Sequence, residues 1–251
     1  MFETLVYTFC KRPYVVAFLI TYLFSASRLL GWRWTLIFLS SGYTLAFFSE
    51  YLSINFGLPY GWYFYKYENL QGEWLNHGVP VWDSASYVFM NYAGLVMARQ
   101  AMASEKVPLS KIKLLCLSAV FVTLLDVVVD PVAHLGKHWF LGDIYYYPNP
   151  GWYFDVTMAN FLGWYVTSLL INGVGIFALG FAENSISLKS THGIDWGVFS
   201  AFGLYYGIMA FGIAIAAWLQ EWGILLCDIL WVGLTVAIIR SRLLAALSRG
   251  P

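Results

Sequence analysis

The sequence predicts an all-α integral membrane protein with about seven transmembrane helices packed in one bundle. The first observation is composition, because 60% of the 251 residues are hydrophobic, 20% are aromatic and 11% are charged. Soluble domains carry about a quarter of charged residues, so this chain has too little polar surface to cover a globule in water. The second observation is that long apolar stretches of sequence alternate with short polar ones. No linker or low-complexity segment interrupts them, so we expect a single transmembrane domain over residues 1–251.

Seven stretches approach or exceed the roughly 20 residues that a helix needs to cross a bilayer. The predicted spans are Tyr14–Leu30, Trp34–Phe56, Val79–Ala98, Ile112–Val129, Thr157–Phe181, Trp196–Leu219 and Gly223–Ile239. The first ends in small residues, a pattern that a signal peptide also shows. Because no segment that needs export follows it, we interpret it as a retained helix.

Positive charges predict the orientation of these spans. Ten of the fourteen lysine and arginine residues fall on the side of the C-terminus, and four fall on the side of the N-terminus. Cytoplasmic loops are enriched in these residues. We therefore expect a multi-pass protein of the cell membrane, with its N-terminus outside and its C-terminus in the cytoplasm.

Carboxyl groups at the outer ends of several spans are the strongest indication of a site. The segment LLDVVVDP closes the fourth span, and its Asp126 and Asp130 are four residues apart, on one face of a helix. Glu50, Asp83 and Asp155 lie near the same level in other spans. A carboxyl group at this depth gives up hydration that lipid cannot replace, which favours a functional role. The alternative is an acidic outer rim, although acidic residues contribute little to topology.

Aromatic residues crowd the two outer loops beside these acids. The sequence GWYF occurs in both loops, at residues 61–64 and 151–154, as a faint duplication or as convergence on residues of the membrane interface. Aromatic faces can enclose a polyene and stabilise positive charge that develops on it. The predicted wall residues of such a slot are Tyr63, Tyr65, Trp152, Tyr153 and Trp164. Packing in the core or in an interfacial belt is the alternative for each.

The residues present argue against several classes of protein. Nucleic acid is not an expected partner, because the net charge is zero and there is no basic run. A retinal protein requires a lysine in the last span, and a di-iron desaturase requires many histidines; this chain offers neither. Asp130, His134 and His138 have a metal-ligand spacing, but Pro131 and Gly136 predict that the helix ends too early. We expect no metal and no cofactor.

Asp126 and Asp130 also resemble the aspartate-rich motif with which intramembrane prenyltransferases hold Mg²⁺ and diphosphate. That class carries a second such motif on a later helix, where this chain has only the isolated Asp155 and Asp228. A single motif is a hypothesis that needs its structural context. The later spans do not supply that context.

Four motifs in order resemble another family. Glu50 precedes GLPYGWYFY, and HGVP, LDVVVDPVA and NFLGW follow at residues 77–80, 125–133 and 160–164. This pattern is similar to that of the CruF-type carotenoid hydratases, which are integral membrane enzymes. The resemblance implies addition of water across the terminal isopropylidene double bond of an acyclic carotenoid end, giving a tertiary alcohol. Asp83 and Asp155 fall where the family pattern differs, so the resemblance assigns them no role.

The chemistry of the residues agrees with that reaction. Hydration of an isolated alkene requires an acid that protonates one carbon and a base that activates water at the other. Of two neighbouring carboxyl groups among apolar side chains, one tends to keep its proton. We predict Asp126 or Asp130 as the proton donor, its partner or Glu50 as the base, and Asn160 as a residue that orients the water. A hydrogen bond between helices is the alternative for Asn160.

Two other functions stay open at the level of sequence. A carotenoid end-group cyclase begins with the same protonation but ends with loss of a proton. A non-enzymatic membrane subunit that binds a carotenoid or a quinone would use the same slot for binding alone. The expected partners are a hydrophobic carotenoid, water, the lipid bilayer and other enzymes of the carotenoid pathway.

Overall fold

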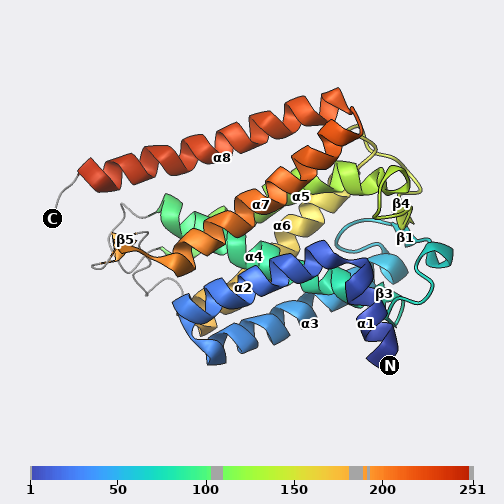
Figure 1. Ribbon diagram of the computed structural model, residues 1–251, viewed down its shortest axis with the longest axis horizontal. Helices are drawn as coiled ribbons and strands as arrows, with labels where there is room; N and C mark the ends of the chain where they lie inside the picture. Colours follow the sequence, from blue (N-terminus) through green and yellow to red (C-terminus); the bar gives the residue numbers. More distant parts are fainter. Residues whose placement is uncertain (1, 103–109, 181–188, 191–192, 249–251) are drawn as a thin grey trace.

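The computed structural model describes residues 2–102, 110–180, 189–190 and 193–248, and long helices dominate this part of the chain (Figure 1). A short helix, α1 (Phe2–Lys11), comes first. The long helices are α2 (Pro13–Leu30), α3 (Trp32–Phe56), α4 (Val81–Ala101), α5 (Lys111–His134), α6 (Met158–Gly173), α7 (Trp196–Trp218) and α8 (Trp222–Ser248). Each contains most of one predicted span. The fifth predicted span continues from α6 into a π-helical turn, η3 (Val174–Ala178), and its last residue, Phe181, lies outside the described residues.

Five of these helices are long and apolar enough to cross a membrane: α2, α5, α6 with η3, α7, and α8 as far as Arg240. The fold is therefore that of an all-α membrane protein, as predicted. Helix α4 is more polar because it lies inside the bundle, where every residue from Tyr87 to Ala101 is buried. Its polar residues, such as Asn91, therefore avoid lipid, which cannot replace their hydration.

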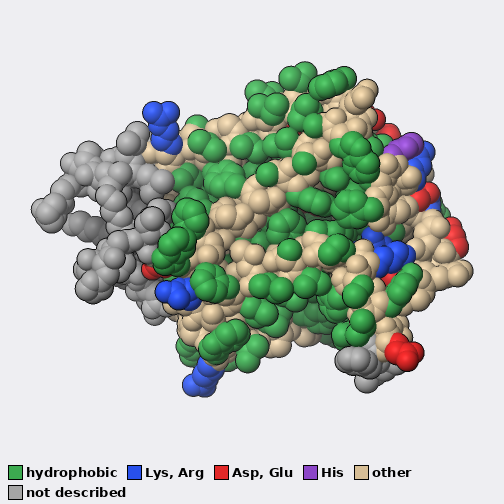
Figure 2. Space-filling model, in the orientation of Figure 1, with side chains coloured by type: hydrophobic (Ala, Val, Ile, Leu, Met, Phe, Trp, Pro, Cys, Tyr) green, Lys and Arg blue, Asp and Glu red, His purple; other side chains and the backbone are tan. Residues whose placement is uncertain are grey.

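The flank of the bundle presents apolar side chains to its surroundings. On α6, the exposed residues Leu162, Val166 and Leu170 follow one another at intervals of four, which places them on one face. Figure 2 shows hydrophobic side chains spread over the sides of the long helices, whereas most of the visible acidic groups gather at one end. This is the surface expected of a bundle whose sides face lipid.

Short strands lie at the two ends of the bundle. At one end, β1 (Phe64–Tyr65) pairs with β4 (Tyr145–Tyr146), and so joins the α3–α4 loop to the α5–α6 loop. A hairpin of β2 (Leu75–Asn76) and β3 (Val79–Pro80) precedes α4, and a pair of β5 (Lys189–Ser190) and β6 (Gly193–Ile194) precedes α7. The N-terminus lies at the β1/β4 end and the C-terminus at the opposite end (Figure 1).

A buried ion pair ties the start of α2 to both loops of the β1/β4 end. The guanidinium of Arg12 donates to the two carboxylate oxygens of Glu73 at 3.0 and 2.7 Å and to the carbonyl of Leu141 at 2.6 Å. Neither charged side chain is exposed. Paired, bidentate geometry of this kind is what allows two charges to be buried together.

Helix α5 extends further than the sequence predicts. It continues through Pro131, past the end of the predicted span at Val129, and ends at His134, before His138 as expected. A proline removes one N–H donor, and here the following turn is retained because Val132 packs in the core with no exposed surface. His138 lies beyond α5 in a 3₁₀ turn, η2 (Gly136–His138). Among the described residues, no three His, Cys, Asp or Glu side chains are grouped so that they could hold a metal ion.

Candidate active site

A cavity of about 150 Å³ lies inside the β1/β4 end of the bundle. Its walls come from α2 to α7 and from the two loops that β1 and β4 join. Four carboxyl groups line it: Glu50 from α3, Asp83 from α4, and Asp126 and Asp130 from α5. The fold therefore brings acids from three helices into one cavity.

Asp126 and Asp130 form one carboxyl pair, bridged by Asn160 at the start of α6. The Asn160 amide nitrogen donates to Asp126 at 2.8 Å and to Asp130 at 3.1 Å. Two hydroxyls also reach Asp130, from Tyr145 at 2.6 Å and from Tyr147 at 2.8 Å. Asp130 thus accepts three hydrogen bonds from side chains, whereas Asp126, which is 3% exposed, accepts one. Donors stabilise a carboxylate, so the two acids have different environments.

Glu50 and Asp83 form the second carboxyl pair, bridged by Tyr65. The Tyr65 hydroxyl lies 2.7 Å from Asp83 and 3.2 Å from Glu50, and Ser84 donates to the other oxygen of Glu50 at 2.5 Å. A phenol has one hydrogen and cannot donate to both acids at once. One of these two contacts is therefore best made by a protonated carboxyl group that donates to the tyrosine oxygen.

No positive side chain of the described residues forms an ion pair with these acids. Within the described part of the chain, no lysine or arginine lines the cavity, and the ion pairs formed involve none of its four carboxyl groups. Arg12 contacts the cavity residue Trp82, with its guanidinium 4.6 Å from the ring centre, and it pairs with Glu73, which Lys11 also contacts at 2.9 Å. Four charged carboxylates in a small, largely apolar space would repel one another strongly, which favours retention of protons.

The tyrosines of the loops act as hydrogen-bond donors to these acids. Burial, followed by the nearby carboxyl groups, raises the pKa of Tyr65 well above its ordinary value. The same causes raise the pKa of Tyr145 and Tyr147. Their hydroxyls therefore keep their protons at any physiological pH, and they remain donors.

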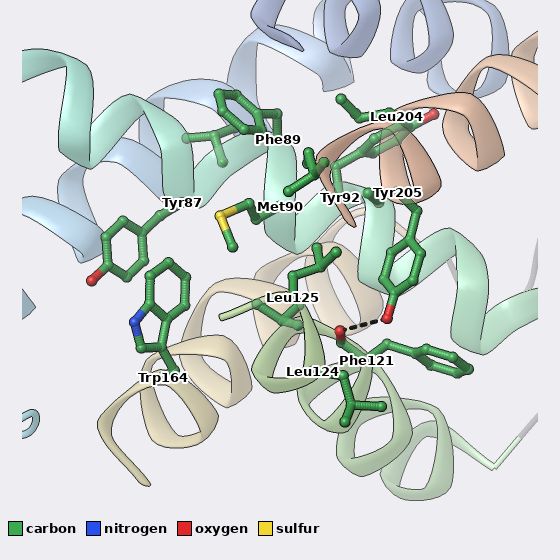
Figure 3. Close-up of a cluster of buried hydrophobic side chains, with 14 of the residues drawn as sticks. Tyr87, Phe89, Met90, Tyr92, Phe121, Leu124, Leu125, Trp164, Leu204 and Tyr205 are labelled. Carbon is green, nitrogen blue, oxygen red and sulfur yellow. Dashed lines mark hydrogen bonds between the residues drawn. The ribbon is translucent and has the colours of Figure 1, made fainter. Parts of the chain in front are cut away.

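Aromatic rings form the wall on the side of α4 and α6. The rings of Tyr87 and Trp164 stack in parallel, with centroids 4.0 Å apart and an angle of 1° between their planes (Figure 3). Tyr60 lies against both, at 6.0 and 6.3 Å. Faces of this kind attract positive charge and exclude water.

The predicted site residues divide into two groups in space. Glu50, Asp126, Asp130, Asn160, Tyr63, Tyr65 and Trp164 all line the cavity. Trp152 and Tyr153 do not: Trp152 is 80% exposed, and the Tyr153 hydroxyl accepts a hydrogen bond from Trp231 of α8 at 3.1 Å. Asp155 is also exposed on the loop. The second GWYF segment therefore packs outside the cavity that the first one helps to form.

Several cavity residues were not singled out from the sequence. Tyr145 and Tyr147 are two apart in an extended segment, so their side chains point the same way. Tyr87 follows Asp83 by one helical turn and shares its face. These spacings were visible in the sequence, but only the pairing of β1 with β4 shows which aromatic part of the second loop turns inward.

A family model for carotenoid biosynthesis proteins matches residues 11–235 of the chain. The chain belongs to this family. The match includes every carboxyl group of the cavity and all seven long helices at least in part. Neither a curated protein nor a solved structure matches the chain. This carotenoid biosynthesis protein thus has a role in making carotenoids, and the cavity is its best candidate for an active site.

Proposed function

We propose that the protein adds water to the terminal carbon–carbon double bond of an acyclic carotenoid end group, without a cofactor. The observation that carries the proposal is the cavity with two carboxyl pairs, aromatic walls and no positive side chain among the described residues. An acid that keeps its proton can protonate an alkene, and a neighbouring carboxylate can stabilise the cation and accept a proton from water. The motifs around Glu50, Asp126 and Asn160 support the same reaction.

The hydrogen bonds support different roles for the two α5 acids. Asp126 accepts a single side-chain hydrogen bond, which suits a protonated acid. Asp130 accepts three, which suits a carboxylate. Asp126 donates its proton to one alkene carbon, and the other becomes a tertiary cation. Water then forms the new carbon–oxygen bond, and its proton passes to a carboxylate of the cavity. Proton transfer among the acids restores Asp126.

The size of the cavity suits an end group rather than a whole carotenoid. A cavity of about 150 Å³ can hold a molecule the size of benzene. The isopropylidene end would enter this space, and the polyene would extend between the helices into the bilayer. Tyr87, Trp164 and Tyr60 would face the cation.

The proposal includes the placement of the protein in the cell. The N-terminus lies at the end of the bundle that holds the cavity, and the C-terminus lies at the other end (Figure 1). With the predicted orientation in the cell membrane, the cavity would lie near the outer surface, where water is available. Other enzymes of the pathway would supply the acyclic substrate through the bilayer.

Expression in a host that accumulates an acyclic carotene tests the proposal. We expect pigments whose mass has increased by one water for each end group converted. Asp126→Asn should lower conversion by roughly 10²- to 10⁴-fold, the usual contribution of a general acid, and Glu50→Gln should also lower it. Asp143→Asn is the matched control, because Asp143 is a partly exposed acid in ion contact with Lys66 outside the cavity.

Other outcomes would reject hydration. A new pigment of unchanged mass with a ring at its end would identify a cyclase. Purification of the protein with an unaltered carotene, in wild type and in both acid variants, would identify a binding subunit. Full conversion by Asp126→Asn would remove Asp126 from the mechanism.

A further inference from the structure

The indole N–H of Trp82 has no hydrogen-bond acceptor among the described residues. The side chain lines the cavity and is 4% exposed, yet its indole nitrogen is buried without a hydrogen-bond partner. An indole N–H can only donate, so it requires an acceptor. A buried donor without one costs free energy, and such a group in a folded protein calls for an explanation.

The position of the Trp82 ring is fixed from behind. The Arg12 guanidinium lies 4.6 Å from the ring centre, and Arg12 is itself held by Glu73 and by the carbonyl of Leu141. The residue also starts the same helix as Asp83, its neighbour in sequence and in the cavity wall. The N–H group is therefore held in the cavity region rather than free to find a partner in bulk solvent.

Tyr14 contributes a second such group from α2. Its hydroxyl is buried and the residue lines the same cavity; the hydroxyl lies beside the Arg12 guanidinium but makes no hydrogen bond of good geometry to any described residue. Its ring stacks on Phe211 of α7, with centroids 5.3 Å apart, which fixes its orientation. Two buried polar groups from two helices, the unpartnered Trp82 N–H and the Tyr14 hydroxyl beside Arg12, therefore border one space.

We propose that Trp82 and Tyr14 hold the water molecule that captures the cation, next to Asp83. The inference rests on the proposed hydration. A hydrocarbon end group cannot accept a hydrogen bond, so the acceptor for the Trp82 N–H must be an oxygen atom outside the substrate. Water fits, because it can accept a hydrogen bond from Trp82, donate one to Asp83, and either donate to or accept from the Tyr14 hydroxyl. A buried water needs two to four such partners.

The capture step then balances without any further reactant. The water oxygen forms a bond to the tertiary carbon, and the oxonium that results loses one proton to the Asp83 carboxylate. Trp82 keeps its hydrogen throughout. Trp82 and Tyr14 are thus positioning residues that decide where the cation meets water, while protonation of the alkene takes place at Asp126.

The ratio of the alcohol product to a double-bond isomer tests this inference. Tyr14→Phe keeps the ring and removes only the hydroxyl, whereas Trp82→Phe replaces the indole by a smaller ring without an N–H group. In both variants the alkene is still protonated, but the cation is captured less often. A cation that is not captured loses a proton and gives a double-bond isomer of unchanged mass. We expect the ratio of alcohol to isomer to fall roughly tenfold in each variant, the effect of one hydrogen bond. Trp196→Phe, an exposed tryptophan at the other end of the bundle, should leave the ratio unchanged.

Thermal stability and total substrate consumption complete the experiment. Tyr14→Phe keeps the ring and its stack on Phe211, so it should unfold close to the wild-type temperature. Trp82→Phe also loses ring area against Arg12 and should unfold at a lower temperature. If both keep the wild-type ratio of products, or consume no substrate while remaining folded, the inference is overturned. A wild-type protein that makes no alcohol would instead reject the proposed hydration itself. Should Trp82→Phe fail to accumulate, Tyr14→Phe carries the test alone.

Discussion

Asn160 and Asp126 lie 34 residues apart in the sequence, and the amide nitrogen of Asn160 donates to a carboxyl oxygen of Asp126 at 2.8 Å. The same nitrogen reaches Asp130 at 3.1 Å. An amide nitrogen carries two hydrogens, so it can serve both acids at once. This bridge joins α5 to α6 and fixes the separation of the two carboxyl groups.

The bridge predicts a strong effect of Asn160→Ala. Hydrogen bonds to charged groups contribute about 1.5–3 kcal/mol, so we expect conversion of the carotene to fall roughly 10- to 100-fold. Pigment analysis by mass in the producing host measures this. Asn55→Ala is the matched control, because that exposed amide donates only to the Tyr51 carbonyl within α3. Equal conversion by the two variants would contradict the role of the bridge.

The buried loop tyrosines predict a loss of stability in alkali. Burial raises the pKa of Tyr145 and Tyr147 in the folded protein above the value of about 10 that an unfolded chain has. A raised pKa favours the protonated form, so this stabilisation is complete below about pH 10 and is lost as the pH rises further. In detergent, the midpoint temperature of unfolding should stay constant from pH 7 to about pH 10 and fall from there to pH 11.

Substitution distinguishes the contribution of these two tyrosines to the alkaline loss of stability from the contribution of the rest of the protein. The double variant Tyr145→Phe/Tyr147→Phe should lose less stability between pH 9 and 11 than the wild type does. Tyr146→Phe, which alters the exposed neighbour between them, should follow the wild type. Identical pH profiles for all three proteins would contradict the assignment.

The Arg12–Glu73 pair predicts a large cost when one partner is removed. Glu73→Gln leaves the fully buried guanidinium without its charge partner, which typically costs 3–5 kcal/mol. Replacement of both residues by apolar ones, as in Arg12→Met/Glu73→Leu, should recover most of that loss. The partly exposed pair of Lys66 and Asp143 offers a comparison, since Asp143→Asn should cost less than about 1 kcal/mol. Unfolding midpoints measure all three.

A close approach at Gly163 predicts that alanine is harmful in the middle of a helix. A Cβ at this position would lie 2.7 Å from the Tyr60 Cα and would also clash with the Tyr60 ring. We expect Gly163→Ala to destabilise the protein by about 1–3 kcal/mol through overpacking, and to lower conversion by displacing the loop that carries Tyr63 and Tyr65. Gly203→Ala meets no atom within 4 Å and should be neutral or slightly stabilising. If both variants lowered the free energy of unfolding, or both raised it, the result would contradict this account.

The bundle and part of the cavity could be predicted because their signals are local. Each long helix contains most of a predicted span, since a run of apolar residues and the rise of an α-helix together fix the length that crosses a bilayer. Asp126 and Asp130 share a face for the same reason, because a spacing of four is one turn. The predicted span stopped at Val129, whereas packing of Val132 retains one more helical turn, as far as His134.

The sequence by itself determined that this is a helical membrane protein with carboxyl groups near one end, because hydrophobicity and helical spacing act over a few residues. Only the tertiary structure decided which side chains accompany those acids. It pairs Glu50 with Asp83 through Tyr65, and it turns Tyr145 and Tyr147 inward while Trp152 stays exposed. The two GWYF segments are identical in sequence, so no local preference separates them. What separates them is the contact between β1 and β4, which joins segments far apart along the chain.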